Sequence, residues 1–149
     1  MTEIERKYLI GNLDILRPLL VSGKAIKQGY LFATSEKSCR IRIKGDRGFL
    51  TIKIGESALV RSEYEYEIPI NDAESLLQTC PRVLSKCRYE LPVEGHTWEI
   101  DVFEGKLEGL VVAEIELTDV DERFLLPPWV GEEVTSDPSY LNVNLINRL

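Results

Sequence analysis

The sequence predicts a mainly β protein of the α+β class, in which antiparallel strands form the framework and a few helices lie at its periphery. Charged and apolar residues alternate with period 2 along most of the 149 residues, which is the pattern of strands with one polar face. Short turn motifs separate several of these segments, and helical patterns are few. A chain of this length is expected to form a single domain that covers residues 1–149.

Strand patterns recur along most of the chain, and strands are predicted at residues 3–9, 25–31, 39–44, 49–54, 60–68, 85–91, 97–103 and 110–117. In the third of these segments, Arg40 and Arg42 alternate with apolar residues. The stretches 45–48 (GDRG) and 94–95 (EG) are typical of hairpin turns. The strands that they join are therefore predicted to be antiparallel.

Helices are predicted at three places. The longest spans residues 71–80, because Asn71 can cap it, Glu74 is placed to complete a capping box, and Pro81 ends it. A short helix is predicted after Asn12, and a C-terminal helix is predicted to start within 136–138. So few helices disfavour a parallel βαβ sheet.

Composition argues against several classes of protein. The net charge of −7 is unlike that of a nonspecific nucleic-acid binder, and no apolar run approaches the roughly 20 residues of a membrane helix. No apolar stretch of signal-peptide length follows the N-terminus, so the cytoplasm is the expected location. Three irregularly spaced cysteines and a single histidine favour reduced thiols over a zinc site.

Charged residues share one face of nearly every predicted strand. Glu3, Glu5 and Lys7 lie on one face of the first strand, and similar rows occur on the later strands. For any single strand, the solvated face of an open sheet explains this pattern. The whole set, with few helices to cover a second face, also fits a sheet that closes so that its charged faces line an interior.

Such an interior would combine metal ligands with phosphate ligands. Residues at i and i+2 of a strand have Cα atoms about 6.5 to 7 Å apart, so Glu3 with Glu5 can straddle a cation, as can Glu114 with Glu116. Oxygen ligands suit Mg²⁺ or Mn²⁺. Arginine forks and lysine point charges suit phosphate oxygens. The cationic strands therefore predict a polyphosphate that is bound together with a bridging metal.

These motifs resemble a known family. Residues 3–7 (EIERK) match the ExExK signature of the CYTH superfamily, the triphosphate tunnel metalloenzymes, and the tail at 129–142 is similar to that of the short bacterial members. The similarity continues through 28–31 (QGYL), 40–42 (RIR), 51–53 (TIK), 63–69 (EYEYEIP), 86–89 (KCRY), 98–103 (WEIDVF) and 113–117 (AEIEL). The resemblance implies a closed antiparallel eight-stranded barrel with a charged tunnel.

The resemblance also implies roles for individual residues. The expected metal ligands are Glu3, Glu5, Asp101, Glu114 and Glu116. The expected substrate-binding residues are Lys7, Lys27, Arg40, Arg42, Lys53, Glu63, Glu65, Lys86 and Arg88, with Gln28 as the alternative inward residue to Lys27. Catalytic roles are expected for Lys7, Arg42, Glu114 and Glu116. Glu67, Lys44, Arg61 and Glu99 continue the strand pattern, and for these residues a place at the rim is an open alternative.

We therefore expect metal-dependent hydrolysis of inorganic triphosphate to pyrophosphate and phosphate, with Mg²⁺ or Mn²⁺ as cofactor. A class IV adenylate cyclase and a triphosphatase for thiamine triphosphate or nucleotides are alternatives within the family. A noncatalytic polyphosphate-binding or nucleotide-binding module is the alternative of another class. The expected partner is the small triphosphate, without nucleic acid or membrane, and the resemblance makes a homodimer plausible.

Overall fold

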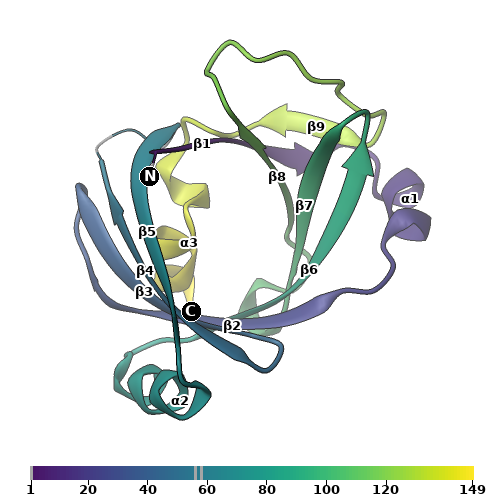
Figure 1. Ribbon diagram of the computed structural model, residues 1–149. Coiled ribbons are helices and arrows are strands. Elements are labelled where there is room, and N and C mark those ends of the chain that lie inside the picture. Colours follow the sequence, from purple (N-terminus) through teal and green to yellow (C-terminus); the bar gives the residue numbers. More distant parts are fainter. Residues whose placement is uncertain (1, 56, 58) are drawn as a thin grey trace.

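The computed structural model describes residues 2–55, 57 and 59–149, and in it the strands close into an antiparallel barrel (Figure 1). The strands are β1 (Thr2–Ile10), β2 (Lys24–Ala33), β3 (Lys37–Lys44), β4 (Arg47–Ile54), β5 (Val60–Ile68), β6 (Leu84–Val93), β7 (His96–Phe103), β8 (Val111–Leu117) and β9 (Val130–Glu133). Their order is β5-β4-β3-β2-β6-β7-β8-β1-β9, and the pairing of β5 with β1 closes the barrel. The predicted fold class is confirmed.

The first strand pairs with three other strands. Because β5 and β9 pair with different ends of β1, the barrel can close and still carry a ninth strand. Residues 4–9 of β1 pair with β8, residues 2–4 pair with β5, and Tyr8 and Ile10 pair with β9. The predicted eight strands are all present, most of them longer by one to three residues at their ends. The four-residue β9 was not predicted, because so short a segment carries no readable period.

Two tight turns fix the register of neighbouring strands. Gly45 and Asp46 connect β3 to β4, and Glu94 and Gly95 connect β6 to β7. Glu94 and Gly95 have φ values of 47° and 81°, which a hairpin turn of type I′ requires. Both predicted hairpins are confirmed, and their registers place alternate side chains inside the barrel.

The two helices outside the barrel follow the sequence signals only in part. Helix α1 (Leu13–Leu16) follows Asn12 as predicted and continues as the 3₁₀ helix η1 (Arg17–Leu19). The Asn12 side chain caps it by accepting a hydrogen bond from the Ile15 amide. Helix α2 (Ile70–Thr79) begins one residue earlier than predicted, directly after Pro69, and no side chain caps it. The predicted Asn71 capping box is therefore wrong.

The C-terminal segment is a series of short helices rather than one. These are the 3₁₀ helix η3 (Pro138–Tyr140), α3 (Asn142–Leu145) and the 3₁₀ helix η4 (Ile146–Arg148), and a further short 3₁₀ helix, η2 (Gly105–Leu107), precedes β8. Asp137 caps η3 by accepting a hydrogen bond of 3.0 Å from the Ser139 amide. Among the described residues, no helix combines the length and apolar character needed to traverse a bilayer.

Much of the apolar core lies outside the barrel wall, because the inner face carries charge. On one side Trp98 makes edge-to-face contacts with Tyr8 and Trp129, at centroid distances of 5.6 and 5.3 Å. On another side α2 covers the outer face of β3 and β4 through Ala73 and Leu77. These outer layers hold the barrel closed without filling it.

One end of the barrel interior is apolar. Phe103 and Val112 lie two residues from Asp101 and Glu114 on their strands, so they share the inner face with them. Leu145 and Ile146 of the C-terminal segment pack on this cluster, and α3 is seen within the ring of strands in Figure 1. The C-terminal segment thus fills part of the interior and leaves a charged cavity beside it.

Candidate active site

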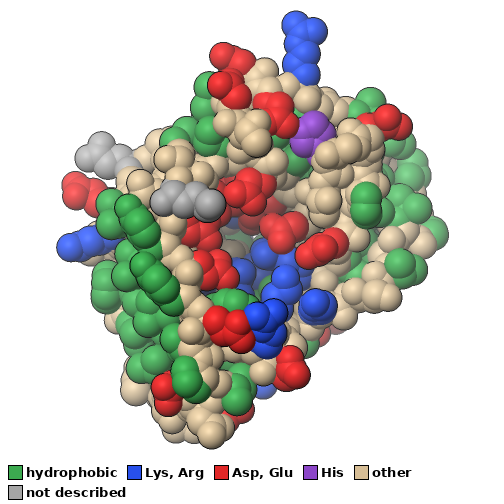
Figure 2. All heavy atoms as spheres, viewed as in Figure 1, with side chains coloured by type: hydrophobic (Ala, Val, Ile, Leu, Met, Phe, Trp, Pro, Cys, Tyr) green, Lys and Arg blue, Asp and Glu red, His purple; other side chains and the backbone are tan. Residues whose placement is uncertain are grey.

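A cavity of about 590 Å³ occupies the barrel interior. Figure 2, which looks at the molecule from the same side as Figure 1, shows acidic and basic side chains gathered in a hollow at the centre of the view. The charged residues of its lining are Glu3, Glu5, Lys7, Arg40, Arg42, Lys44, Lys53, Arg61, Glu63, Glu65, Arg88, Glu99, Glu114 and Glu116. They come from β1, β3, β4, β5, β6, β7 and β8, so only the closed barrel brings them together.

Three buried arginines form a cationic wall. The guanidinium of Arg42 donates from Nε and Nη2 to Oε1 of Gln28, at 2.9 and 2.7 Å. Arg40 donates to the hydroxyl of Thr51 at 3.3 Å, and its Nε has no partner among the described residues. Burial, reinforced by Arg40 and Arg88, lowers the pKa of Arg42 to about 9. The guanidinium is still charged at neutral pH, and the hydrogen-bond partners of Arg40 and Arg42 within the described chain are neutral.

Beneath the wall, Asp101 is buried between two cations. Its carboxylate accepts hydrogen bonds from Lys86 Nζ at 2.6 Å and from Arg88 Nε and Nη2 at 2.7 and 2.9 Å. Burial alone would raise the pKa of Asp101, but Lys86 and Arg88 outweigh burial and hold that pKa well below its usual range. Both oxygens of this carboxylate are therefore already paired with Lys86 or Arg88.

Carboxylates from β1 face the cationic wall. Glu3 lies 2.9 Å from the Lys53 ammonium, and Glu5 lies 3.2 Å from the Arg61 guanidinium. Burial, with the nearby Glu114 as the next largest cause, raises the pKa of Glu5 to about 7, although Lys53 and Lys7 act to lower it. Burial and a hydrogen bond with Glu63 also raise the pKa of Glu3. The acidic side of the cavity therefore favours an additional cation.

Lys7 connects the acidic side to the C-terminal segment. Its ammonium lies 3.3 Å from Glu114 Oε1 and donates to the Tyr140 carbonyl at 2.9 Å. Its backbone amide donates to the Thr135 hydroxyl at 3.0 Å. Burial would lower the pKa of Lys7, but Glu114 and Glu5 raise it, so the ammonium stays charged. Glu114 is correspondingly held ionised, since Lys7 and Arg88 outweigh its burial.

The donor set fits a hard divalent cation. The available ligands are carboxylate oxygens, which suit Mg²⁺ or Mn²⁺, and the raised pKa of Glu5 is the effect that a bound cation would reverse. Among the described residues, no three His, Cys, Asp or Glu side chains converge into a ready-made metal cage. Mg²⁺ typically uses one or two carboxylates together with substrate phosphates and water. Glu3 and Glu5 fit that kind of site.

The structure brings most of the sequence-predicted residues into one cavity, including Lys44, Arg61 and Glu99, which were left open. Four of these residues lie elsewhere. Lys27 is exposed on the outer face, because the register that pairs Gln28 with Arg42 points Gln28 inward. Lys86 and Asp101 lie behind the cavity lining, where they pair with one another. Glu67 is exposed and pairs with Arg47.

Several uncharged residues of the lining were missed. Ser38 and Thr51 follow the same strand parity as Arg40 and Lys53, so the period-2 pattern could have found them. Asn142 reaches the cavity from α3. No local pattern indicates that position, because the C-terminal segment enters the barrel through contacts with residues more than 100 positions away.

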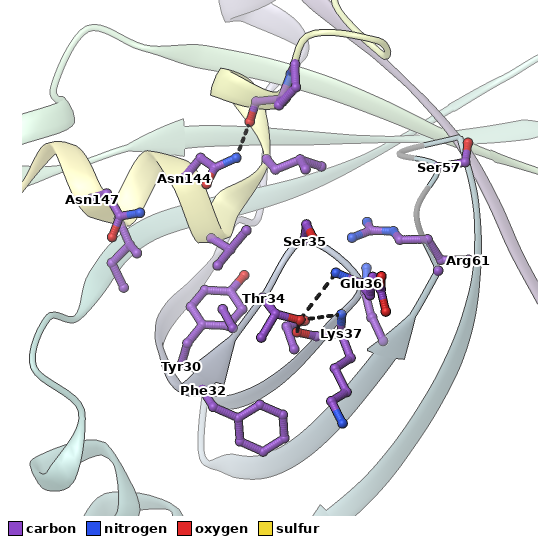
Figure 3. A pocket seen from close by; sticks show the side chains of 18 of the residues that line it. Tyr30, Phe32, Thr34, Ser35, Glu36, Lys37, Ser57, Arg61, Asn144 and Asn147 are labelled. Atoms are coloured by element: carbon purple, nitrogen blue, oxygen red, sulfur yellow. Dashed lines mark hydrogen bonds between the residues drawn. The ribbon is translucent and has the colours of Figure 1, made fainter.

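A second cavity, of about 880 Å³, adjoins the first (Figure 3). It lies between the β2–β3 connection, the start of β5 and the C-terminal helices, and Tyr30, Phe32, Arg61 and Asn144 are among the lining residues that Figure 3 labels. Lys53, Arg61 and Val143 are among the residues that line both cavities. The interior therefore continues from the charged chamber into a less charged one.

The sequence matches the CYTH domain family over residues 1–149. A protein of Acetivibrio thermocellus that is named an inorganic triphosphatase is 46% identical over 148 residues, covering 98% of this chain and 94% of that protein. A Nitrosomonas europaea protein of the same name is 38% identical, covering 95% of each chain.

Solved structures agree in fold. The structure of the inorganic triphosphatase NE1496 has a TM-score of 0.68 at 33% identity and covers 98% of this chain and 95% of that chain. A protein of Hippeastrum described as a putative adenylyl cyclase with a dominant triphosphatase activity has a TM-score of 0.56 at 18% identity, covering 78% of this chain and 80% of that chain. At that identity the likeness extends to the fold alone.

Proposed function

The chain belongs to the CYTH domain family, and we propose that it hydrolyses inorganic triphosphate to pyrophosphate and phosphate with Mg²⁺ or Mn²⁺. The observation that carries this proposal is the charged cavity, in which a wall of arginines faces the carboxylates of β1 and β8. Two relatives that cover nearly the whole chain are named inorganic triphosphatases. An anion of high charge density fits the wall, and a divalent cation fits the carboxylates.

The cationic side would bind and orient the phosphates. Arg42 offers the nitrogens that Gln28 leaves free, while Arg40, Arg88, Lys7 and Lys53 add positive charge around the chamber. Because most of these groups are buried, their attraction to phosphate oxygens is screened less than at a surface. They would stabilise the charge on the terminal phosphate as the phosphoanhydride bond breaks.

The acidic side has two separable roles. Glu3 and Glu5 would hold the metal ion, which when bound neutralises phosphate charge and lowers the pKa of a coordinated water. Glu116 would orient the attacking water. Burial raises its pKa, nearby Glu3 adds to this effect, and it forms no ion pair within the described chain. Glu114 instead fixes the ammonium of Lys7, at 3.3 Å.

One assay tests the proposal. The purified protein is offered triphosphate, ATP and thiamine triphosphate with Mg²⁺ or Mn²⁺, and orthophosphate, pyrophosphate and cyclic AMP are measured. We expect equimolar pyrophosphate and phosphate from triphosphate, with the highest kcat/KM for that substrate and no turnover in chelator. Cyclic AMP as the main product from ATP, or tight triphosphate binding without metal-dependent release, would replace the proposal by the cyclase or by the noncatalytic module.

The second cavity favours one alternative, an organic triphosphatase. Tyr30 and Phe32 give that cavity aromatic surface next to the charged chamber, which would suit an organic group attached to a triphosphate. The same assay separates the two, because an organic triphosphatase would turn over thiamine triphosphate or ATP with a higher kcat/KM than triphosphate.

We further propose that residues 1–149 act as one domain in the cytoplasm. The free thiols of Cys39, Cys80 and Cys87 support a reducing compartment. A homodimer is also proposed, supported by the exposed apolar side chains of Ile54 and Tyr66 on the outer face of β4 and β5. Fractionation tests the first of these proposals, and light scattering at several protein concentrations tests the second.

A further inference from the structure

Gln28 is a fully buried amide to which the proposed mechanism gives no part. It lies on β2, opposite Arg42 of β3 and opposite Leu84 of β6, with 0% of its surface exposed. Its Nε2 is buried without a hydrogen-bond partner among the described residues. A buried amide with one unsatisfied end costs stability, so this position requires an explanation beyond packing.

The contact between Gln28 and Arg42 is specific in geometry. A single oxygen, Oε1, accepts from both Nε and Nη2 of the guanidinium, at 2.9 and 2.7 Å. A guanidinium has five N–H groups in a rigid plane. Holding one edge through Nε and Nη2 fixes that plane and leaves Nη1 for the cavity, which Arg42 lines.

The electrostatic surroundings make a neutral partner unusual here. Arg40 and Arg88 disfavour a charge on Arg42, and Asp101, the carboxylate that favours it, is already shared by Lys86 and Arg88. A glutamate has nearly the same shape as glutamine, accepts stronger hydrogen bonds from arginine, and would relieve this repulsion. The amide leaves the repulsion in place.

We propose that Gln28 is a positioning residue for phosphate recognition: it holds the Arg42 guanidinium in the geometry of an ion pair but leaves its charge for the triphosphate. This inference rests on the proposed function of the cavity. The bound triphosphate then supplies the negative charge that position 28 withholds. Stability of the ligand-free protein is lower, and affinity for the anion is higher, than with a carboxylate at this position.

The test compares the stability and the substrate affinity of Gln28→Glu with those of wild type, because the stability should rise while the affinity falls. The ligand-free variant should melt at a temperature higher by roughly 2 °C or more, because the added charge relieves repulsion in a buried cluster. Its KM for triphosphate should rise by about tenfold or more, because Arg42 is already neutralised. A residue with only a structural role would not raise stability while it weakens binding.

Two further variants make the comparison specific. Gln28→Met keeps the volume and the neutrality but removes the acceptor, so it should lower both the melting temperature and kcat/KM. Gln78→Glu makes the same chemical change at an exposed position of α2, away from the cavity, and should leave the KM unchanged.

Binding is measured separately by calorimetric titration of triphosphate in chelator, without metal and without turnover. Gln28→Glu should weaken this binding by a similar factor. If wild type hydrolyses triphosphate and Gln28→Glu keeps the wild-type KM and affinity, the role of Gln28 is wrong while the proposed function stands. If wild type binds triphosphate but does not hydrolyse it, the proposed function fails, and the titration still decides the role of Gln28.

Discussion

Glu5 and Asp101 are both largely enclosed carboxylates of the barrel interior, but their surroundings give them different tasks. Burial raises the pKa of Glu5 to about 7, and Glu114 adds to the effect. Asp101 is buried as well, yet Lys86 and Arg88 hold its pKa well below the usual range. Glu5 thus lacks a sufficient counter-charge and would gain one from a metal ion, whereas Asp101 serves as the counter-charge for two cations.

The raised pKa of Glu5 predicts that metal affinity depends on pH. A metal must displace the proton that Glu5 retains below about pH 7, so affinity for Mg²⁺ should fall by about tenfold per pH unit below that value. Calorimetric titrations between pH 5.5 and 8.5 measure this slope. Glu5→Gln, which cannot ionise at this position, should bind Mg²⁺ weakly and with a smaller slope, and a pH-independent affinity in wild type would contradict the assignment.

The same shift predicts the stability of the metal-free protein. The folded state keeps the Glu5 proton up to about pH 7, whereas the unfolded chain releases it near the ordinary glutamate pKa of 4.5. Stability from this group is therefore lost as pH rises from about 4.5 to 7, and Mg²⁺ should offset the loss. Melting temperatures with chelator and with Mg²⁺ should diverge as pH rises, and parallel curves would contradict this.

Asp101→Asn should destabilise the protein by about 3 to 5 kcal/mol, because Lys86 would remain buried without its counter-charge and Arg88 would keep only its pair with Glu99. Urea unfolding measures the loss. The control, Glu67→Gln, breaks the exposed pair with Arg47 and should leave the free energy of unfolding close to that of wild type, because solvent screens this pair. Strongly weakened Mg²⁺ binding in Asp101→Asn with unchanged stability would contradict this account and support the metal-ligand role that the family resemblance implies.

Among the secondary-structure elements, those with a clear period were predictable and those fixed by distant contacts were not. Alternation located β3 and β5 because each has one charged face and one apolar face. It also placed Glu3, Glu5 and Lys7 on one face. The C-terminal segment resisted prediction, since the hydrogen bonds of Lys7 to Thr135 and Tyr140 span 128 and 133 residues.

Within correctly predicted strands, it was harder to predict which residues point into the barrel. Lys27 was expected to reach the substrate because the sequence does not say which of two adjacent polar residues points inward. The β-bulge near Tyr30 to Phe32 adds to this difficulty, because it interrupts the alternation of β2. The structure decides through pairing, since Gln28 lies opposite Arg42.

The packing of α2 on the barrel depends on a glycine. A Cβ built at Gly48 of β4 would lie 2.6 Å from the Cβ of Ala73, too close for a real contact. Gly48→Ala should therefore destabilise the protein by about 1 to 3 kcal/mol through overpacking. Urea unfolding measures the change.

The partner substitution provides the control for this clash. Ala73→Gly removes the opposing methyl group at a cost of about 1 kcal/mol in helix propensity. The double variant should be more stable than the two single losses predict, by roughly 1 kcal/mol. Simple additivity would show that α2 does not contact β4 through these residues.

For the whole molecule, barrel closure produces the site and determines where the core lies. The arginines of β3 and β6 reach the carboxylates of β1 and β8 only because β5 pairs with β1. The outside of the barrel is covered by α1, α2 and the segment around Trp129. One inner end of the barrel is filled by Leu145 and Ile146. Stability comes from apolar clusters around and at one end of the barrel, and the charged chamber is left for a ligand.

Kinetic comparison of wild type with Arg42→Ala tests most directly whether this chamber is where triphosphate is hydrolysed. With Mg²⁺ and triphosphate as substrate, kcat/KM should fall by roughly 100-fold or more, because a buried guanidinium that faces phosphate oxygens is lost. Arg47→Ala, an exposed arginine of the same sheet outside the cavity, should match wild type. Wild-type kcat/KM in a folded Arg42→Ala would contradict hydrolysis in the barrel interior.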